Sequence, residues 1–298
     1  MTMPLSIVIT TYNREDELCR CINSIIKQKY ANYEIIIVDD HSSLNYKDNI
    51  LSKYKDIKYI YQEKNTGPGI ARNKGIQEAR FNHVIIMDDD DVFVDDAFEK
   101  INTFFYEHKD LDEPVYHFLC TTTKLNDHIE YRKYNFKEYL DGIITGDTVH
   151  VINKKVFCEK YNYAFPDSKI GAELLLWYKI VIEHGYSVVN KVIVKVLEDA
   201  SNRLTNANKE ITKVDLFAQY QRDIICEFEK DILHVGNINH LLTKYRGAIV
   251  YSLLEGNKKS AMEYMLKSLK YSKKQFAFIP LFILPKKYIT GMLRKYRN

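Results

Sequence analysis

Cysteine is scarce in this sequence, and the few cysteines are scattered along it. They are Cys19, Cys21, Cys120, Cys158 and Cys226. Their number is odd, and their spacing does not match the paired ligands of a zinc site. We therefore expect neither a disulfide framework nor a structural zinc site, and the pattern indicates a reducing cytoplasm.

Long hydrophobic runs are also missing. The N-terminal apolar run, Leu5–Ile9, is too short for a signal peptide or a spanning helix, and no basic residue precedes it. No other segment reaches membrane-spanning length. We therefore interpret Leu5–Ile9 as the first strand of a globular domain.

The sequence lacks two familiar nucleotide-binding signatures. Arg72 occupies the third glycine position of the dinucleotide fingerprint after Gly67 and Gly69. The GK[ST] signature of a P-loop occurs nowhere in the chain. A dehydrogenase or a P-loop nucleotidase is therefore disfavoured.

Acidic residues are absent from the C-terminal tail. The chain has 298 residues and a net charge of +3, and residues 273 to 298 hold seven Lys or Arg and no Asp or Glu. The preceding part thus carries 3 − 7 = −4. With 46% hydrophobic and 28% charged residues, the composition is globular. We expect one α/β domain of about 200 residues with an appendage.

Short apolar segments alternate with helical patterns in the first third of the chain. The expected strands are Leu5–Thr10, Glu34–Val38, Ile57–Tyr61 and Val84–Met87. Strands separated by helices favour a parallel sheet with right-handed crossovers. Ligands bind such sheets beyond the carboxyl ends of the strands. Polar clusters follow three of these strands, at residues 10–13, 39–40 and 88–91.

Four consecutive carboxylates, Asp88 to Asp91, follow the last of these strands. Strand alternation would turn Asp88 and Asp90 to one side. Carboxylates this close resist joint ionisation unless a cation lies among them, and oxygen ligands suit Mg²⁺ or Mn²⁺. The structural alternative is a solvated acidic turn before a helix that Asp96 and Glu99 cap as a capping box. The pattern alone leaves both open.

The stretch Asn65–Gly75 combines glycines with Arg72 and Lys74 on the first turns of a helix. Glycines allow a close approach of the backbone to a ligand, and free amides with basic side chains suit a diphosphate. A loop that needs glycine only for positive φ, beside an exposed basic helix face, explains the same residues.

Four motifs carry a family resemblance through their order and spacing. They are Ser6–Arg14, Ile37–Ser43, Asn65–Gly75 and Met87–Asp91. Together they resemble the GT-A glycosyltransferases of family 2, over residues 5 to 200. The resemblance implies a Rossmann-like, doubly wound, mostly parallel α/β sheet. It also implies an inverting, metal-dependent enzyme that moves a sugar from a nucleoside-diphosphate sugar, with uridine the expected base. The implied acceptor is a glycan or a lipid-linked saccharide in surface polysaccharide biosynthesis.

The resemblance also implies roles for single residues. The residues matched to donor nucleotide binding are Thr10, Tyr12, Asn13, Arg14, Asp40, Gly69, Arg72, Asp88 and Asp89. Asp90 matches the usual ligand of Mn²⁺ or Mg²⁺ in the family's DXD motif, and Asp88 faces the donor ribose or the metal. Asp91 extends this acidic end and would support the metal ligands.

Glu173 matches the family's catalytic base, with a departure. In Lys169–Trp177, Ala172 stands where the family usually has Glu, and Glu173 where it has the Asp base. Glutamate reaches about one methylene further, so the base role needs a different placement of backbone or acceptor. The structural alternative is a carboxylate that stabilises the N-terminus of a helix at 172–184, which Gly185 ends.

The polar stretch Ser201–Asn208 marks the expected domain boundary. Residues 1 to 200 would form the GT-A domain, with a nucleotide-sugar half at 1 to 110 and an acceptor half at 111 to 200. His117 and His150, in the second half, are interpreted as core residues without a role. Residues 201 to 298 would form an α-helical extension. Its predicted helices are Val214–Leu233, Ile238–Leu254 and Lys259–Tyr271.

The apolar segment Phe276–Leu284 has basic borders, so the basic amphipathic tail could lie on an anionic membrane surface. The alternative is that the same apolar face packs on the catalytic domain. The expected partners are a nucleotide sugar, a saccharide acceptor and such a membrane, but no nucleic acid. The expected location is the cytoplasm, peripherally at the inner membrane.

Two other functions stay open. A sugar nucleotidyltransferase would need a glycine-rich, basic signature near the N-terminus, which residues 10–14 do not offer. A non-catalytic nucleotide-sugar-binding or scaffold protein is the second, because Ala172 replaces a glutamate of the family motif.

Overall fold

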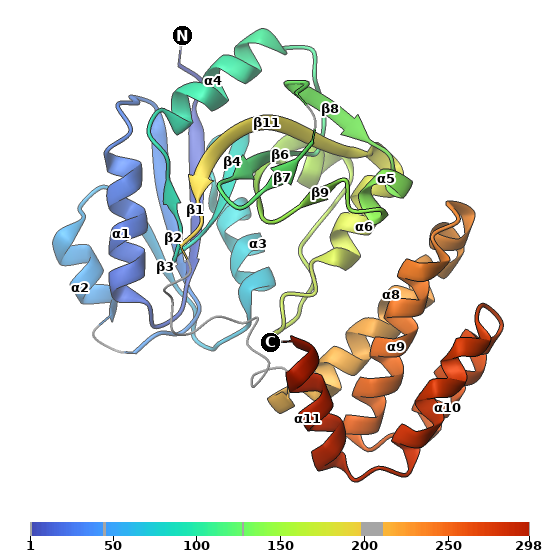
Figure 1. Ribbon diagram of the computed structural model, residues 1–298. Helices are drawn as coiled ribbons and strands as arrows, with labels where there is room; N and C mark the ends of the chain where they lie inside the picture. The colour runs from blue at the N-terminus through green and yellow to red at the C-terminus, as the bar shows by residue number, and fades with distance from the viewer. Residues whose placement is uncertain (1, 44–45, 127, 198–210, 298) are drawn as a thin grey trace. The chain divides into compact units, whose positions relative to one another are not determined.

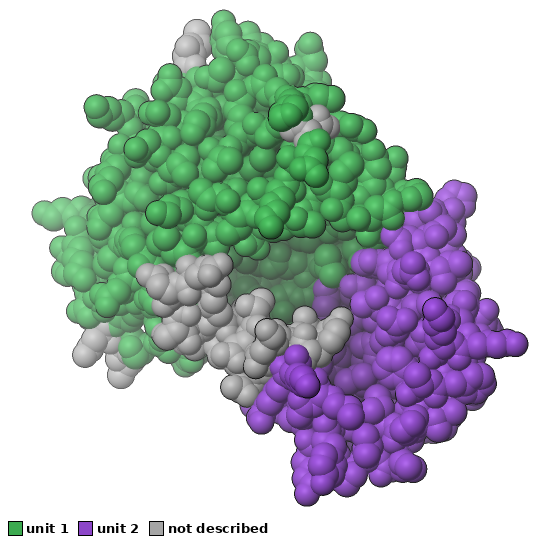
Figure 2. Space-filling model, in the orientation of Figure 1, with its two compact units in different colours: residues 1–201 green, residues 202–298 purple. Residues whose placement is uncertain are grey.

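The computed structural model describes residues 2–43, 46–126, 128–197 and 211–297 (Figure 1). The chain divides into two compact units, Met1–Ser201 and Asn202–Asn298, which Figure 2 colours separately. The predicted loop Ser201–Asn208 lies outside the described residues.

The first half of unit 1 is a parallel sheet whose strands are joined by helices. Its strands are β1 (Leu5–Thr11), β2 (Tyr33–Asp39), β3 (Ile57–Tyr61) and β4 (His83–Asp88), in the order β3-β2-β1-β4. The joining helices are α1 (Glu15–Ile26), α2 (Tyr46–Lys53) and α3 (Pro68–Glu78). All four strands that the pattern predicted are therefore confirmed, and their carboxyl ends meet at one edge (Figure 1).

The second half of unit 1 extends this sheet with strands of both directions. The remaining elements are β5 (Val92–Phe93), α4 (Ala97–Glu107), β6 (Val115–Cys120), β7 (Lys124–Leu125), β8 (Tyr131–Tyr134), α5 (Phe136–Leu140), β9 (Ile144–Thr145), β10 (Thr148–Asn153), the π-helix η1 (Lys155–Lys160), α6 (Leu174–His184) and β11 (Tyr186–Lys195). Strand β10 runs antiparallel between β4 and β6, whereas β11 runs parallel to β6. The α/β fold class is confirmed, as a mixed sheet with flanking helices.

Hydrophobic side chains cover both faces of the sheet. On β1, Ile7 and Ile9 face one buried cluster, which includes residues of α1 and α4. Val8 faces a second cluster with residues of α3 and α6. A parallel strand buried on both faces reads as a continuous apolar run, which explains why the first strands were easy to predict.

Gly75 lets helix α3 lie directly on strand β1. A Cβ atom at this position would lie 2.2 Å from Cγ1 of Val8. We expect Gly75→Ala to lower the free energy of unfolding of unit 1 by about 1–3 kcal/mol, because the added methyl overpacks the core. Urea unfolding followed by fluorescence of Trp177, the single tryptophan, measures it.

The matched change Gly291→Ala, in a helix where a Cβ meets nothing within 4 Å, should be neutral or stabilising. The double variant Val8→Ala, Gly75→Ala should recover part of the loss, because it removes the clashing methyl groups. Equal stability of Gly75→Ala and wild type would contradict the close contact.

The predicted capping box before α4 is wrong. Asp96 is the N-cap, but it has left-handed backbone angles (φ 61°) and its side chain accepts no capping hydrogen bond. An N-cap side chain reaches the helix amides from an extended backbone, which Asp96 does not have. Helix capping therefore does not explain the acidic stretch.

Unit 2 is helical, and its three predicted helices are confirmed. They are α8 (Val214–His234), α9 (Ile238–Glu255) and α10 (Lys258–Leu269), followed by the 3₁₀ helix η2 (Lys273–Phe282) and by α11 (Lys286–Arg297). Ile249, Ala261, Ile289 and other apolar residues form its own buried cluster. Among the described residues, no helix is both long and apolar enough to cross a membrane.

Candidate active site

The loops after β1 and β2 are locked together through Asn13. The amide of Asn13 donates to Oγ of Ser42 over 2.8 Å, and the amide of Ser43 donates to Oδ1 of Asn13 over 2.9 Å. Asn13 has left-handed backbone angles (φ 52°), which asparagine tolerates well. Thr10 is half-buried beside Asp88, and Tyr12 is exposed. Asn13 thus holds the loop from which Tyr12 projects.

Asp40 fixes the loop that precedes α3. Its Oδ1 accepts hydrogen bonds from the amide of Thr66 (2.7 Å) and from Nε2 of Gln62 (2.9 Å). Its Oδ2 accepts from the amide of Gly67 (2.8 Å). Both carboxylate oxygens are therefore engaged by the protein itself. The predicted contact of Asp40 with the donor stays a prediction.

The glycines of this loop make room for the chain's own backbone. A Cβ at Gly69 would lie 2.2 Å from the carbonyl oxygen of Pro166, and one at Gly67 would lie 2.7 Å from that of Ser168. The close approach seen at Gly69 is thus to Pro166, whereas we expected an approach to a ligand. The donor role of Gly69 stays a prediction.

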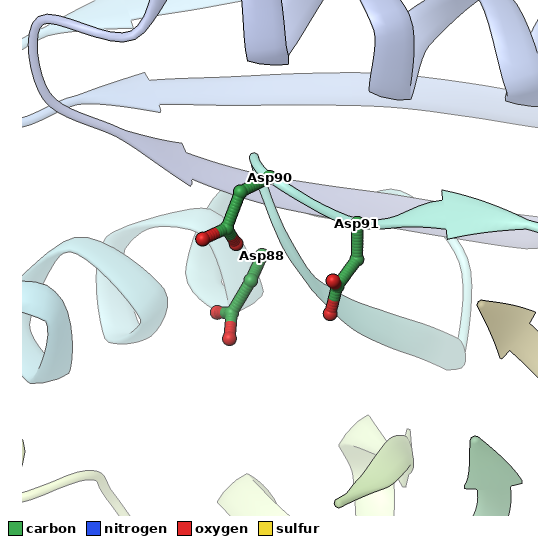
Figure 3. A group of neighbouring side chains, drawn as sticks. All are labelled: Asp88, Asp90 and Asp91. Carbon is green, nitrogen blue, oxygen red and sulfur yellow. The ribbon is translucent and has the colours of Figure 1, made fainter. Parts of the chain in front are cut away.

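The acidic stretch forms a tight turn that gathers three carboxylates. Strand β4 ends at Asp88, and the amide of Asp91 donates back to the carbonyl of Asp88 over 3.4 Å. Asp88, Asp90 and Asp91 each bring one oxygen within 4.8 Å of the others (Figure 3). Strand alternation did not predict this grouping, because the turn begins after Asp88. Three converging carboxylates fit a hard divalent cation.

The remaining carboxylate of the turn points to Arg14. NH1 of Arg14 lies 2.8 Å from Oδ1 of Asp89 and 3.1 Å from Oδ2 of Asp90. Burial raises the pKa of Asp89 to about 7, although the charge of Arg14 opposes the shift. Arg14, which we matched to donor binding, therefore holds the acidic turn in this structure.

Asp91 is also affected by its surroundings. Burial raises the pKa of Asp91 to about 7, and the charges of Asp88 and Asp90 add to the shift, against a hydrogen bond from the amide of Leu197. That amide donates to Oδ1 of Asp91 over 3.0 Å. A bound cation would favour the ionised carboxylates, so this cluster gains from a counter-charge.

Arg72 links the acidic turn to Glu173. From α3, NH2 of Arg72 donates to Oδ1 of Asp88 over 2.9 Å, and NH1 donates to Oε1 of Glu173. The side chain is buried beside the ring of Phe165, 5.5 Å from its centroid. Its Nε is buried without a hydrogen-bond partner among the described residues. One guanidinium thus joins a residue at the end of β4 to a residue at the start of α6.

Glu173 does not cap helix α6. It occupies the N-cap position with helical angles, and its side chain makes no capping hydrogen bond. The two residues before it, Gly171 and Ala172, have positive φ angles of 86° and 36°. This sharp turn aims the Glu173 carboxylate at Arg72. The carboxylate pairs with Arg72 instead of a helix amide, and its charge still lies at the N-terminus of α6.

His117 is buried and His150 is half-buried, and both rings contact Trp177 of α6. The His150 ring stacks on Trp177 with a centroid distance of 4.3 Å, and the His117 ring lies edge-on, 5.5 Å from Trp177. Nδ1 of His117 is 3.3 Å from the carbonyl of Ser187. These contacts agree with the interpretation of His117 as a core residue, whereas His150 is only partly covered.

The buried His117 contributes a loss of stability in acid, which the raised pKa values of Asp89 and Asp91 oppose. Burial lowers the pKa of His117 to about 3, whereas an unfolded histidine titrates near 6.5. Between these values the unfolded chain binds more protons, so stability should fall by about 1.4 kcal/mol per pH unit for this group as pH drops below 6.5. Urea unfolding between pH 7 and pH 5 measures the slope.

The variant His117→Leu should give a shallower slope, because it removes one titrating group. His150, Trp177 and Tyr186 surround the ring, and His150 titrates in the same direction. Asp89 and Asp91 titrate with the opposite sign, so the test is the difference between the slopes of variant and wild type. An unchanged slope would contradict the assignment.

Comparison with known proteins identifies the family. The family model "Glycosyl transferase family 2" matches residues 6–157. That range contains the acidic turn, Arg72 and both interlocked loops. The chain belongs to this family. Glu173 lies beyond the matched range, so the match does not bear on it.

Relatives of known sequence share part of the chain. An uncharacterized glycosyltransferase of Haemophilus influenzae is 30% identical over 166 residues, 51% of this chain and 66% of that protein. The poly(ribitol-phosphate) β-N-acetylglucosaminyltransferase TarP of Staphylococcus aureus is 32% identical over 109 residues, 35% of this chain and 33% of that protein. The match to a Rickettsia conorii relative likewise covers only 35% of that protein. These matches therefore span one third to two thirds of their relatives.

Solved structures share the fold of this family 2 chain. Residues 1–349 of S. aureus TarS in complex with UDP-GlcNAc align with a TM-score of 0.58 at 16% identity, over 92% of this chain and 93% of that one. The mannosyltransferase PcManGT of Pyrobaculum calidifontis, in complex with GDP-Man and Mn²⁺, aligns with a TM-score of 0.51 at 14% identity, over 99% and 88%. At these identities the likeness establishes the GT-A fold alone.

Proposed function

We propose that this family 2 protein transfers a sugar from a nucleoside-diphosphate sugar, with uridine as the base, to a hydroxyl of a glycan or lipid-linked saccharide. The proposal includes inversion at the anomeric carbon and a role in surface polysaccharide biosynthesis. The observation that carries it is the group of three carboxylates at the end of β4 with the Arg72 guanidinium beside it. Family membership supports the reaction class.

Asp88, Asp90 and Asp91 would hold Mn²⁺ or Mg²⁺ in this proposal. Their oxygens converge from one turn, and hard cations prefer such ligands. The bound ion would neutralise charge on the departing diphosphate. Arg14 would keep Asp90 in place through its ion pair with the turn.

Arg72 and Glu173 would have different roles in the transfer, Arg72 toward the leaving diphosphate and Glu173 toward the attacking hydroxyl. Arg72 is a buried cation with an unused Nε donor, which suits an anionic diphosphate. Glu173 would accept the proton of the attacking hydroxyl, so that attack and departure occur in line in a single displacement. When the diphosphate engages Arg72, Glu173 would lose part of its ion pair and become available to the acceptor.

Calorimetric titration of UDP and of GDP, each with and without Mn²⁺, tests the donor part of the proposal. We expect UDP to bind with Mn²⁺ and much more weakly without it. Preferential binding of GDP would correct the nucleotide, and failure of both to bind would overturn the proposed function.

A non-catalytic nucleotide-sugar-binding protein is the second candidate. The replacement at Ala172 and the pairing of Glu173 with Arg72 favour it, since a base held by a cation is not free to accept a proton. Metal-dependent donor binding with no transfer and no donor hydrolysis, across a set of saccharide acceptors, would select this candidate.

A further inference from the structure

Charge is divided unequally between the two units. Residues 202–298 contain 18 Lys or Arg and 8 Asp or Glu, a formal charge of +10, so residues 1–201 carry −7. No Asp or Glu follows Glu263. The positive charge therefore accumulates toward the end of unit 2, in α10, η2 and α11 (Figure 1).

The apolar residues of the tail separate into buried and exposed sets. Phe278, Leu281, Phe282 and Leu284 pack against the buried cluster of unit 2, and Ile289 and Leu293 belong to it. A second set, the exposed tail residues, has 46 to 85% of its surface open. These residues are Phe276, Ile279, Ile283, Tyr288 and Met292. The first set therefore packs in the core of unit 2, and the exposed tail residues remain uncovered.

The local geometry explains how both sets arise from one segment. In the 3₁₀ helix η2, residues three apart lie above one another, so Phe276 and Ile279 share a side. In α11, residues four apart share a side, so Tyr288 and Met292 lie next to each other, as do the buried Ile289 and Leu293. Phe276 and Ile279 in η2, and Tyr288 and Met292 in α11, thus form exposed apolar pairs, and the exposed Ile283 follows directly after η2.

Exposed cations accompany the exposed tail residues. They are Lys273, Lys274, Lys286, Lys287, Arg294 and Lys295. Cations alone would suit any polyanion, but five exposed apolar side chains among them suit a surface that is both anionic and apolar beneath. An anionic lipid bilayer has this chemistry, because its acyl region lies below negatively charged headgroups.

We propose that η2 and α11 dock unit 2 on an anionic lipid bilayer, with Phe276, Ile279 and Ile283 entering the boundary between headgroups and acyl chains. The flanking lysines and arginines contact lipid phosphates. This inference rests on the proposed function. Docking on the bilayer would bring the enzyme close to an acceptor that is linked to a lipid of that bilayer.

Vesicle flotation of the full chain tests the proposal. One vesicle set contains phosphatidylcholine alone, and the other an equal mixture of phosphatidylcholine and phosphatidylglycerol. We expect binding to the mixed vesicles only, weakened by added salt. The triple variant Phe276→Ser, Ile279→Ser, Ile283→Ser should bind about tenfold more weakly, because its apolar contribution is lost.

Two matched variants in α10 test whether vesicle binding depends on the tail itself or on any exposed apolar or basic residue of unit 2. Met262→Ser, Leu266→Ser removes exposed apolar residues from α10, and Lys258→Gln, Lys259→Gln removes exposed charge from its start. Both should bind like wild type, whereas Lys286→Gln, Lys287→Gln should bind at least about fivefold more weakly. Circular dichroism and UDP titration confirm that each variant is folded.

Three outcomes would overturn the proposal. The first is failure of the wild type to float with anionic vesicles while it still binds UDP, which rejects docking and leaves the proposed function intact. The second is vesicle binding that the serine triple variant retains in full and that heparin competes away, which assigns the tail to a soluble polyanion. The third is a dimer that the serine variants dissolve, which assigns the exposed tail residues to a second copy of the chain.

Discussion

Glu173→Gln is expected to lower kcat by about 10²- to 10⁴-fold and to leave the Kd for UDP with Mn²⁺ nearly unchanged. Glutamine has the same length, and its amide oxygen can still accept the hydrogen bond from NH1 of Arg72. The variant therefore keeps the arrangement of Arg72 and removes only the basic carboxylate. Steady-state kinetics with a transferred sugar, beside calorimetry with UDP, separates the two effects.

The same helix provides the control for this change. Glu183 is a carboxylate of α6 that accepts a hydrogen bond from Tyr163, far along the helix from Glu173. Glu183→Gln should leave kcat within about twofold, because it changes charge without touching the acidic turn. If Glu173→Gln retained near-normal transfer, the base assignment would be wrong. Glu173→Asp keeps a carboxylate but shortens the side chain by one methylene. Its kcat shows how strongly transfer depends on the position of the carboxylate.

The parallel half of unit 1 could be predicted from the sequence because its signals are local. Each of β1 to β4 is a short apolar run with a polar cluster or helical pattern beside it, and burial on both faces makes such runs continuous. The helices of unit 2 were found for the same reason, since their spacing repeats over many residues. The two-residue strands β5, β7 and β9 have no such pattern, and only pairing with distant strands defines them.

The sequence predicted which residues belong to the candidate site, but it did not predict which of them contact each other. Arg72 and Glu173 were each singled out, yet the bond between them joins positions 101 residues apart and has no local signal. Asp91 was given a supporting place, whereas the turn after Asp88 brings its oxygen into the carboxylate group. The reach of Arg14 to Asp89 and Asp90 likewise depends on how β1 and β4 lie side by side. In a parallel sheet the carboxyl ends of neighbouring strands lie close together. The polar residues after β1 and β4 were therefore the signal from which the contact of Arg14 with the acidic turn could have been predicted.

The second large effect is expected from Asp90→Ala, which removes the central carboxylate of the acidic turn. Metal-dependent binding of UDP should be lost, and kcat should fall by about 10²- to 10³-fold, because charge on the leaving diphosphate is no longer balanced. Without metal the variant should be at least as stable as wild type, since one of several repelling carboxylates is gone and Arg14 keeps its ion pair with Asp89.

Thermal unfolding distinguishes loss of a metal ligand from loss of structure. Mn²⁺ should raise the Tm of wild type, because an ion that binds only the folded chain stabilises it, and should leave the Tm of Asp90→Ala unchanged. Asp95→Ala, which removes an exposed carboxylate just beyond β5, should keep the full Mn²⁺ response. An equal Mn²⁺-induced rise in Asp90→Ala and wild type would place the ion elsewhere. If the Mn²⁺-induced rise in Tm were lost in both variants, Mn²⁺ would be binding to the general negative charge of this region. Binding at a specific site in the turn would be lost only when a carboxylate of the turn is removed.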